Sequence, residues 1–167
     1  TPENIGKADV AIEFTRPESA LANVMFCLEN GVPVVCGTTG WIRDMNKVEE
    51  TCKKKEGSFL YASNFSIGVN IFFELNRKLA ELMHGRKEYD VSMQEIHHIH
   101  KKDAPSGTAI SLAQDIIDRG LKNSFSIDDK GKDSLKIKSI REDEVPGTHL
   151  INYFSENDQI EIIHTAH

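Results

Sequence analysis

The sequence predicts an α/β fold in two parts, a parallel sheet covered by helices and then an α+β unit with a mixed sheet. Three short apolar runs alternate with helical patterns as far as Ala62, and links this short imply right-handed crossovers between parallel strands. Later runs alternate polar and apolar residues and are joined by hairpin-like turns, which indicates a mixed or antiparallel sheet. We place the domain boundary near Asn64, which gives one domain over residues 1–64 and another over 65–167.

The first domain is predicted to contain three strands and two helices. Val32–Cys36 is apolar on both faces, as expected of a parallel strand covered by helices. Pro17 suits a first helical turn, and Gly31 suits the end of the same helix. The strands are Asp9–Thr15, Val32–Cys36 and Ser58–Ala62, and the helices run from Pro17 to Gly31 and from about Asp44 to Lys55.

Three loops follow the carboxyl ends of these strands, where open α/β sheets bind their ligands. They are Phe14–Arg16, Gly37–Gly40 and Ser63–Ser66. In Gly37–Gly40 two glycines flank two threonines and would let a flat ligand approach the backbone, although a plain tight turn explains the pattern equally well. The chain contains no Gly-x-Gly-x-x-Gly. We therefore predict a partial Rossmann-type dinucleotide-binding domain that lacks its first strand and glycine-rich loop, with a small flavodoxin-like domain as the alternative.

The second domain is predicted to begin with a helix that Ser66 caps and Gly85 ends. A strand over Tyr89–His98 then places Val91, Met93 and Glu95 on one face by its period of two. We expect the remaining elements to be a helix from Ser106 to Gly120, a surface loop over Asn123–Asp133, and strands over Leu135–Ile140, Thr148–Phe154 and Gln159–His164.

The stretch Glu95–Ala109 contains the highest density of side chains that could take part in catalysis or ligand binding. It contains three imidazoles and two ammonium groups, followed by a helix start at Ser-Gly-Thr. The first turn of that helix points unpaired N–H groups and the positive end of its dipole at whatever lies before it, which suits a carboxylate or a phosphate. Lys101 and Lys102 would add positive charge there. The residues therefore predict an anion-binding enzyme site in which one histidine acts as an acid near neutral pH.

Other interpretations of this stretch have less support. On a strand His98 and His100 share one face while His97 takes the other, and the neighbouring lysines would repel a divalent cation, so we predict no metal. Ser106 is better placed as a helix cap than as a nucleophile, because no Gly-x-Ser-x-Gly surrounds it. The simplest alternative is that the histidines form only a polar strand end.

Composition excludes two classes of partner. The formal net charge of −6 argues against a nucleic acid held through its phosphates, and no apolar run approaches the ~18 residues of a membrane span. The three cysteines lack a Cys-x-x-Cys spacing, so we expect buried thiols in a reducing compartment and hence a cytoplasmic protein.

Four segments resemble, in the same order, motifs of the dihydrodipicolinate reductase family. The longest, EIHHIHKKDAPSGTA over Glu95–Ala109, is similar to the family signature E-x-H-H-x-x-K-x-D-x-P-S-G-T-A. The other three are EFTRP over Glu13–Pro17, GTTG over Gly37–Gly40 and ASNFSIGVN over Ala62–Asn70. The resemblance spans most of the chain from Asp9 to His164 and is weakest across Leu121–Asp133.

The resemblance implies an oxidoreductase of lysine and diaminopimelate biosynthesis that transfers a hydride from NADH or NADPH to 4-hydroxy-tetrahydrodipicolinate. It implies His97 and Lys101 as catalytic residues, the first as proton donor and the second assisting protonation. It implies His98, Gly107 and Thr108 as contacts of the cyclic dicarboxylate substrate, and a homotetramer built through the sheet of the second domain. The cofactor-binding residues that it implies are Phe14, Thr15, Gly37, Thr38, Thr39, Ser63, Asn64 and Phe65.

The sequence departs from the family pattern in three respects. Glu13 stands where the family more usually has aspartate, the glycine-rich loop is absent, and the family's closing segment after His164 is missing. We therefore expect a fragment truncated at both ends that binds cofactor poorly and turns over little. An inactive fragment or a non-catalytic oligomerisation module is the alternative. A semialdehyde dehydrogenase would need a nucleophilic cysteine in a loop, whereas Cys36 lies inside an apolar strand.

Overall fold

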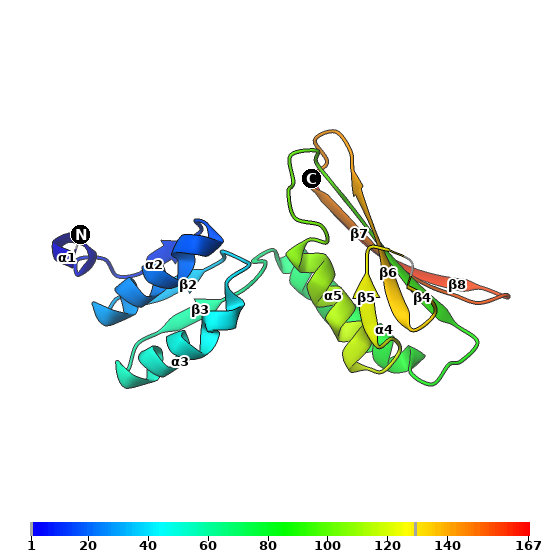
Figure 1. The fold of residues 1–167 in the computed structure, drawn as a ribbon, viewed down its shortest axis with the longest axis horizontal. Helices are drawn as coiled ribbons and strands as arrows, with labels where there is room; N and C mark the ends of the chain where they lie inside the picture. The colour runs from blue at the N-terminus through cyan, green and yellow to red at the C-terminus, as the bar shows by residue number, and fades with distance from the viewer. Residues whose placement is uncertain (1, 129) are drawn as a thin grey trace. The chain divides into compact units, whose positions relative to one another are not determined.

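The computed structural model describes residues 2–128 and 130–167, which divide into two compact units (Figure 1). One extends through Phe65 and the other runs from Ser66 to His167. No helix among the described residues has the length and apolar character needed to cross a membrane.

The first unit is a three-stranded parallel sheet with helices, as predicted. Its strands lie in the order β1-β2-β3, and both pairings are parallel. Pro17 opens α2, and Gly31, with φ of +73°, follows its end in the left-handed region that favours glycine. The short α1 and η1 were not predicted. The elements are α1 (Pro2–Ile5), β1 (Ala11–Glu13), α2 (Pro17–Glu29), β2 (Val34–Cys36), η1 (Ile42–Asp44), α3 (Met45–Lys54) and β3 (Phe59–Tyr61).

The core of the first unit is small and has Trp41 at one end. The ring of Trp41 packs edge-on against the rings of Phe59 and Tyr61, and its Nε1 donates to the carbonyl oxygen of Thr38 at 2.7 Å. The unit's buried residues come from α2, β2 and α3 and the loops beside them, and include Ala20, Val24, Leu28, Val34, Cys36 and Val48.

The second unit is built on a mixed five-stranded sheet, which confirms the predicted fold class. Its strand order is β5-β6-β4-β7-β8. β4 pairs in parallel with β6 and antiparallel with β7, and β7 forms a hairpin with β8. Its elements are α4 (Ile67–Met83), β4 (Asp90–His97), α5 (Gly107–Asp118), β5 (Ser124–Ser126), β6 (Ser134–Arg141), β7 (Gly147–Phe154) and β8 (Gln159–Ala166).

One predicted element of this unit was wrong. Asn123–Asp133, expected to be a surface loop, contains β5, which pairs in parallel with the start of β6. A strand of three residues carries too little alternation to be recognised, and its partner lies beyond a turn. The sheet order also differs from a simple meander, because β4 lies between β6 and β7.

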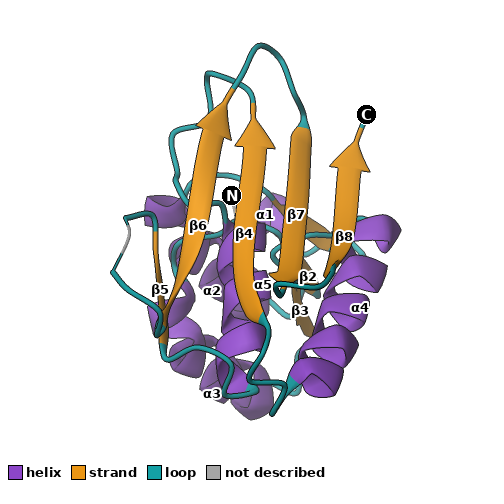
Figure 2. Cartoon of the chain, turned by 90° about the vertical axis from the view of Figure 1, so that its right-hand side faces the viewer, coloured by secondary structure: helices purple, strands orange, loops and turns teal. Residues whose placement is uncertain are grey.

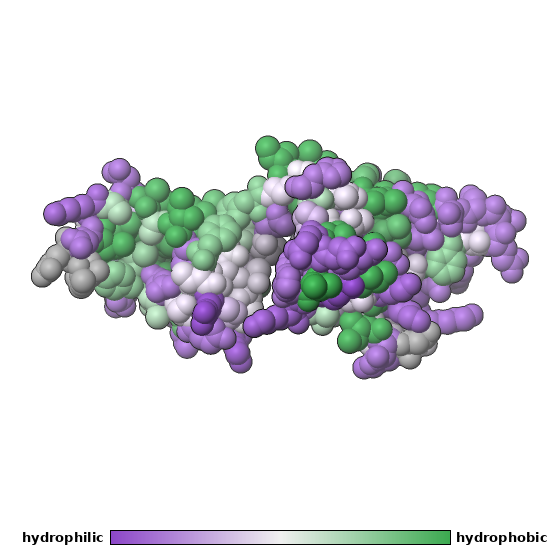
Figure 3. Space-filling model, turned by 90° about the horizontal axis from the view of Figure 1, so that it is seen from above, coloured by the Kyte–Doolittle hydropathy of each residue, from purple (hydrophilic) through white to green (hydrophobic). Residues whose placement is uncertain are grey.

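Helices α4 and α5 cover one face of the mixed sheet and leave its other face open (Figure 2). Their apolar faces pack on alternate residues of the strands, and the buried cluster includes Phe72, Phe73, Leu112, Ile116, Ile137, Ile151 and Tyr153. Hydrophobic side chains also remain at the surface, where green patches interrupt the hydrophilic residues (Figure 3). Exposed examples in α4 are Ile67, Ile71, Leu75 and Leu82.

Candidate active site

Because side chains alternate along β4, two ionisable residues of this strand lie on the helix-covered face of the sheet. Residues at every second position from Val91 to His97 are buried, as the period of two predicts, so Glu95 and His97 continue the apolar row of Val91 and Met93. Glu95 is 0% exposed. A carboxylate buried this deeply requires partners that replace its water.

The start of α5 supplies the first partner of Glu95. The Ser106 side chain caps the helix by accepting from the backbone N–H of Ala109 at 3.1 Å, as predicted. The backbone N–H of Ser106 donates to both oxygens of Glu95, at 3.2 and 3.0 Å. Gly107 and Thr108 therefore form the first turn of α5 directly beside the buried carboxylate, and Thr108 is itself almost fully buried.

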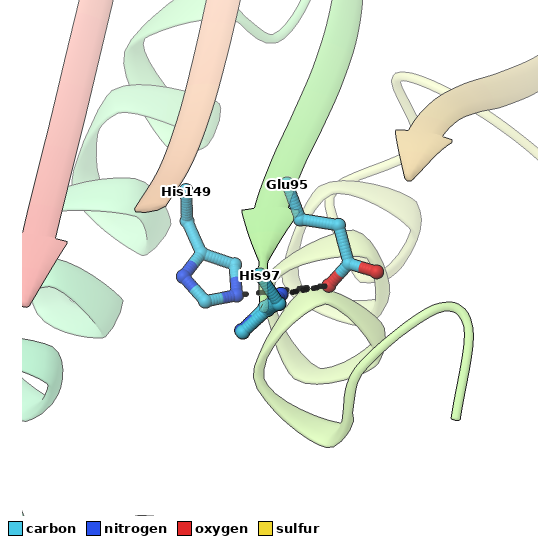
Figure 4. Close-up of side chains that lie close together, drawn as sticks. All are labelled: Glu95, His97 and His149. Carbon is cyan, nitrogen blue, oxygen red and sulfur yellow. Dashed lines mark ion pairs between the residues drawn. The ribbon is translucent and has the colours of Figure 1, made fainter. Parts of the chain in front are cut away.

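A second buried histidine completes the cluster, which Figure 4 shows as Glu95, His97 and His149. Glu95 Oε2 lies 3.6 Å from His97 Nδ1 and 3.8 Å from His149 Nε2. The two imidazole rings meet edge-on, with centroids 5.1 Å apart and planes at 74°. His149 Nε2 also lies 3.2 Å from the Ser106 hydroxyl.

Sequence reasoning missed His149, although a signal was present. Alternation in β7 places His149 on the same face as Ile151 and Tyr153, and all three are buried. A histidine in the alternating apolar row of a predicted strand is unusual, and this feature could have identified His149 from the sequence.

The electrostatics of the cluster favour an ionised Glu95 beside two neutral imidazoles. Burial would raise the pKa of Glu95, but hydrogen bonding from Ser106 outweighs it, and the pKa lies below its usual value. Burial lowers the pKa of His97 despite the opposing attraction of Glu95. Burial, reinforced by the positive charge of a protonated His97, lowers the pKa of His149 to about 4.

Two cations lie beside the cluster. Lys101 Nζ contacts both carboxylate oxygens of Asp103, at 2.8 and 3.0 Å. Arg141, another residue that sequence reasoning missed, lies 3.5 Å from Glu95 Oε1 and donates to the carbonyl oxygens of Lys101 and Asp103. Arg141 thus ties the loop after β4 to the end of β6.

The other two predicted histidines lie farther out. His98 is half-buried, and its ring centroid is 6.1 Å from that of His100. His100 is exposed and pairs with Glu144 at 3.3 Å. Of the predicted set, His97 is part of the cluster, Lys101 acts on it electrostatically from the loop after β4, and Gly107 and Thr108 begin the helix whose cap contacts Glu95.

Glu95, His97 and His149 have ligand atoms within 4.8 Å of one another, a spacing that could hold a divalent metal ion. However, the carboxylate already accepts the Ser106 N–H, and the Lys101 and Arg141 cations flank the cluster. Both features would weaken the binding of an added cation, so we assign no metal to this cluster.

The first unit gathers five of the predicted cofactor-side residues around one hollow. Phe14, Thr15, Gly37, Thr38 and Thr39 line it together with Pro17, and its volume is about 300 Å³. It lies at the carboxyl ends of β1 and β2. A Cβ at residue 37 would lie 2.1 Å from the Phe14 ring, so glycine lets this ring pack directly against the backbone of the loop.

Glu13, at the end of β1, holds these loops together. Its buried carboxylate accepts hydrogen bonds from Thr38 Oγ1 at 2.6 Å, from Cys36 Sγ at 3.1 Å, from Asn23 Nδ2 at 3.3 Å and from the Thr15 hydroxyl. The backbone N–H of Thr15 donates to Thr38 Oγ1 at 2.8 Å. The loop after β1 is therefore fixed to the loop after β2.

The third cofactor-side loop follows β3. Ser63 and Asn64 are half-buried there. Phe65 is 42% exposed, and its ring centroid lies 5.7 Å from that of Phe14, which is 60% exposed. Exposed rings beside a glycine-lined hollow at this edge of a parallel sheet fit a flat aromatic ligand such as a nicotinamide.

The second unit also contains a cavity of about 480 Å³ apart from the acid–base cluster. It is formed at the start of β4 and the end of β7, and Lys87, Tyr89, Lys122 and Phe154 are among its lining residues. Lys122 pairs there with Asp90 at 2.6 Å. The acid–base cluster lies at the opposite end of β4.

A helix-covered parallel sheet with ligand loops at its carboxyl edge, followed by a mixed sheet with an acid–base cluster, defines the class of two-domain, Rossmann-type proteins. Comparison with protein families shows which family of this class the chain belongs to. The family model described as dihydrodipicolinate reductase, C-terminus, matches residues 68–167, and the one described as dihydrodipicolinate reductase, N-terminus, matches residues 2–65. The chain belongs to the dihydrodipicolinate reductase family.

Individual relatives agree with this assignment. The chain is 51% identical to the 4-hydroxy-tetrahydrodipicolinate reductase of Christiangramia forsetii over 159 residues, which is 95% of this chain and 66% of the relative. A dipicolinate-bound dihydrodipicolinate reductase from Paenisporosarcina sp. TG-14 superposes with a TM-score of 0.68 at 28% identity, covering 96% of this chain and 63% of that structure. A probable dehydrogenase from Thermotoga maritima, at 13% identity and a TM-score of 0.55, shares the fold alone. The chain thus spans about two thirds of the length of these reductases.

Proposed function

We propose that this chain forms the substrate-binding part and some of the cofactor-binding part of a 4-hydroxy-tetrahydrodipicolinate reductase. The reaction would transfer a hydride from NADH or NADPH to 4-hydroxy-tetrahydrodipicolinate and give tetrahydrodipicolinate, in lysine and diaminopimelate biosynthesis. The observation that carries the proposal is the buried Glu95–His97 pair beside the first turn of α5. This pair supplies an acid where the helix can hold a carboxylate.

Two anion-binding groups suit the two carboxylates of the substrate. The free N–H groups of the first turn of α5, at Gly107 and Thr108, together with the Thr108 hydroxyl, would bind one of them at the positive end of the helix. His98 and the loop after β4, which carries Lys101, would face the remainder of the ring. Charged hydrogen bonds of this kind both anchor and orient a substrate.

His97 would supply the proton that follows the hydride. Its pKa is lowered by burial in the free protein, so the imidazole is neutral near pH 7. A bound dicarboxylate would favour the imidazolium, because opposite charge nearby raises the pKa of a histidine. Lys101 would offset the negative charge of the substrate and assist protonation. The acid would thus be charged when the substrate is in place.

The loops of the first unit would hold the nicotinamide end of the cofactor, which supplies the hydride when bound. Phe14 and Phe65 would present their rings to it, and Gly37 with Thr38 and Thr39 would line the hollow beside it. The residues fit NADH and NADPH equally, because these loops would face the nicotinamide and its ribose, away from the 2′-position that distinguishes the two cofactors.

We also propose that the second unit forms a homotetramer through its sheet, as the resemblance implies. Helices cover only one face of that sheet (Figure 2), and β8 at its edge exposes Ile163 on the other face. Light scattering should give four times the mass of the chain. A monomeric mass would contradict the proposed assembly.

The reductase activity is tested on the product of the full coding region that contains this chain. Oxidation of NADH or NADPH should depend on 4-hydroxy-tetrahydrodipicolinate and should yield tetrahydrodipicolinate. Running both cofactors in parallel also determines which one is preferred. Absence of substrate-dependent oxidation with either cofactor would refute the proposed function and leave the non-catalytic oligomerisation module.

A further inference from the structure

Glu95 lies between the proposed acid, His97, and the first turn of α5. Its carboxylate is fully buried, accepts the Ser106 N–H at the start of α5, and lies 3.6 Å from His97 Nδ1. His149 repeats the connection from β7, since its Nε2 lies 3.2 Å from the Ser106 hydroxyl and its ring packs edge-on against that of His97. The proposed acid and the proposed carboxylate-binding turn therefore share the same two buried neighbours.

The two nitrogens of His97 have different surroundings. Nδ1 is buried, has no hydrogen-bond partner among the described residues, and faces Glu95. The opposite edge of the ring faces Gly147, where a Cβ would lie 3.1 Å from Nε2 and 3.2 Å from Cδ2. The missing side chain at Gly147 leaves room for the edge that carries Nε2.

We propose that Glu95 and His149 are positioning residues for His97. The carboxylate favours the ring form that carries its proton on Nδ1, which leaves Nε2 to exchange a proton with the substrate. His149 restricts rotation of the His97 ring and connects it to the start of α5 through Ser106. This inference rests on the proposed function only for its kinetic consequences, because the preferred nitrogen is a property of the protein itself.

The distance between Glu95 and His97 makes the interaction mainly electrostatic. At 3.6 Å it is longer than a normal hydrogen bond, but an N–H directed at a buried carboxylate is favoured over a lone pair in the same place. Other charges also act on the cluster. Asp103 favours a charged His97 while Lys101 and Arg141 oppose it, and His164 acts on His149 from β8.

A purely structural role for Glu95 predicts a different outcome. If Glu95 serves only to accept the Ser106 N–H, glutamine will replace it well, because its amide oxygen can accept the same hydrogen bond. If Glu95 acts on His97, Glu95→Gln removes the charge and changes the histidine even though the helix start is kept. Phenylalanine and glutamine make the matching comparison at position 149, since only glutamine can still bond to Ser106.

The first experiment identifies the protonated nitrogen of His97 in this chain by nitrogen-15 NMR of the imidazole rings. In the neutral wild-type ring we expect the proton on Nδ1, and in Glu95→Gln we expect this preference to weaken. A wild-type His97 with its proton on Nε2 would overturn the proposal. This readout does not depend on catalysis, so it stands even if the reductase activity is absent.

The second experiment follows turnover against pH in the product of the full coding region. Glu95→Gln should lower kcat by ~10- to 100-fold with KM within about threefold, and should move the alkaline limb of the kcat profile to lower pH, because the imidazolium loses its counter-charge. His149→Phe should lower kcat similarly, and His149→Gln should retain most of it. Glu144→Gln, which removes an exposed carboxylate beside His100, is the matched control. It should change neither kcat nor the position of the alkaline limb. Unchanged kcat and an unmoved pH limb in Glu95→Gln would refute the positioning role.

Discussion

Glu13 permits a quantitative test of how the loops of the first unit are held. Its buried carboxylate accepts from two donors on each oxygen, Thr15 and Asn23 at Oε1 and Cys36 and Thr38 at Oε2. Glutamine has one acceptor oxygen and an amide that itself donates. In Glu13→Gln one pair of donors therefore loses its acceptor and meets the N–H groups of the amide.

The cost follows from the bonds that are lost. A hydrogen bond to a charged group contributes about 1.5–3 kcal/mol, and a buried donor left without a partner costs a similar amount. Because one pair of buried donors loses a charged acceptor, we expect Glu13→Gln to reduce the free energy of unfolding of the first unit by about 2–4 kcal/mol.

Trp41 provides the assay. It is the single tryptophan of the chain and is buried in the first unit, where its Nε1 donates to the Thr38 carbonyl. Its fluorescence during urea titration therefore reports on the unit that contains Glu13. With a slope of about 1 kcal/mol per M, the midpoint should fall by ~2 M or more. Glu50→Gln, on the exposed side of α3, is the control and should stay within about 0.5 kcal/mol of wild type. A Glu13→Gln midpoint equal to that of Glu50→Gln would refute this explanation of the loops.

The same carboxylate gives the first unit a defined pH dependence. Burial would raise the pKa of Glu13, but hydrogen bonds from Thr15, Thr38 and its other donors outweigh it and hold the pKa below its usual value. A lowered folded-state pKa means that the stabilisation is present above the pKa of the unfolded state and is lost as pH falls through the lower, folded value. Glu13→Gln should remove this part of the acid sensitivity, and an unchanged acid profile would contradict it.

Three further predictions concern the second unit. Thr108→Val should weaken binding of a ring dicarboxylate by ~10- to 100-fold in calorimetry, because a hydroxyl bond to a carboxylate is lost, and wild-type affinity would contradict its role. In the product of the full coding region, His97→Ala should lower kcat by ~10²- to 10⁴-fold, and Lys101→Ala should also lower kcat. Both variants should change KM less than kcat. Unchanged turnover in His97→Ala would exclude His97 as the acid. Leu112→Ala should reduce the free energy of unfolding by about 2–5 kcal/mol, measured by denaturant titration, because Leu112 is fully buried between the helices and the sheet; a loss below 1 kcal/mol would contradict this packing.

The elements with a strong local pattern could be predicted from the sequence. Period two in β4 placed Glu95 on the buried face with Val91 and Met93, and Ser106 could be recognised as a helix cap because capping depends on neighbouring residues. The short β5 could not be recognised, because its pairing with β6 is the main feature that makes it a strand.

The composition of the candidate site could be predicted only in part, for a related reason. His149 and Arg141 reach the cluster from β7 and β6, and the order of strands that brings them beside β4 depends on long-range pairing. The motif from Glu95 to Ala109 therefore revealed the proposed acid and the carboxylate-binding turn, whereas the residues that surround them required the fold.

The central claim is that the start of α5 and the Glu95–His97 pair form one binding site for a ring dicarboxylate. Titrating this chain with pyridine-2,6-dicarboxylate, and with pyridine-2-carboxylate as the one-carboxylate control, tests it directly by NMR. We predict saturable shifts of the Gly107 and Thr108 amides and of the His97 ring, with clearly weaker binding of the control. Equal binding of both ligands, or shifts confined to other places such as the cavity beside Lys122, would contradict the claim.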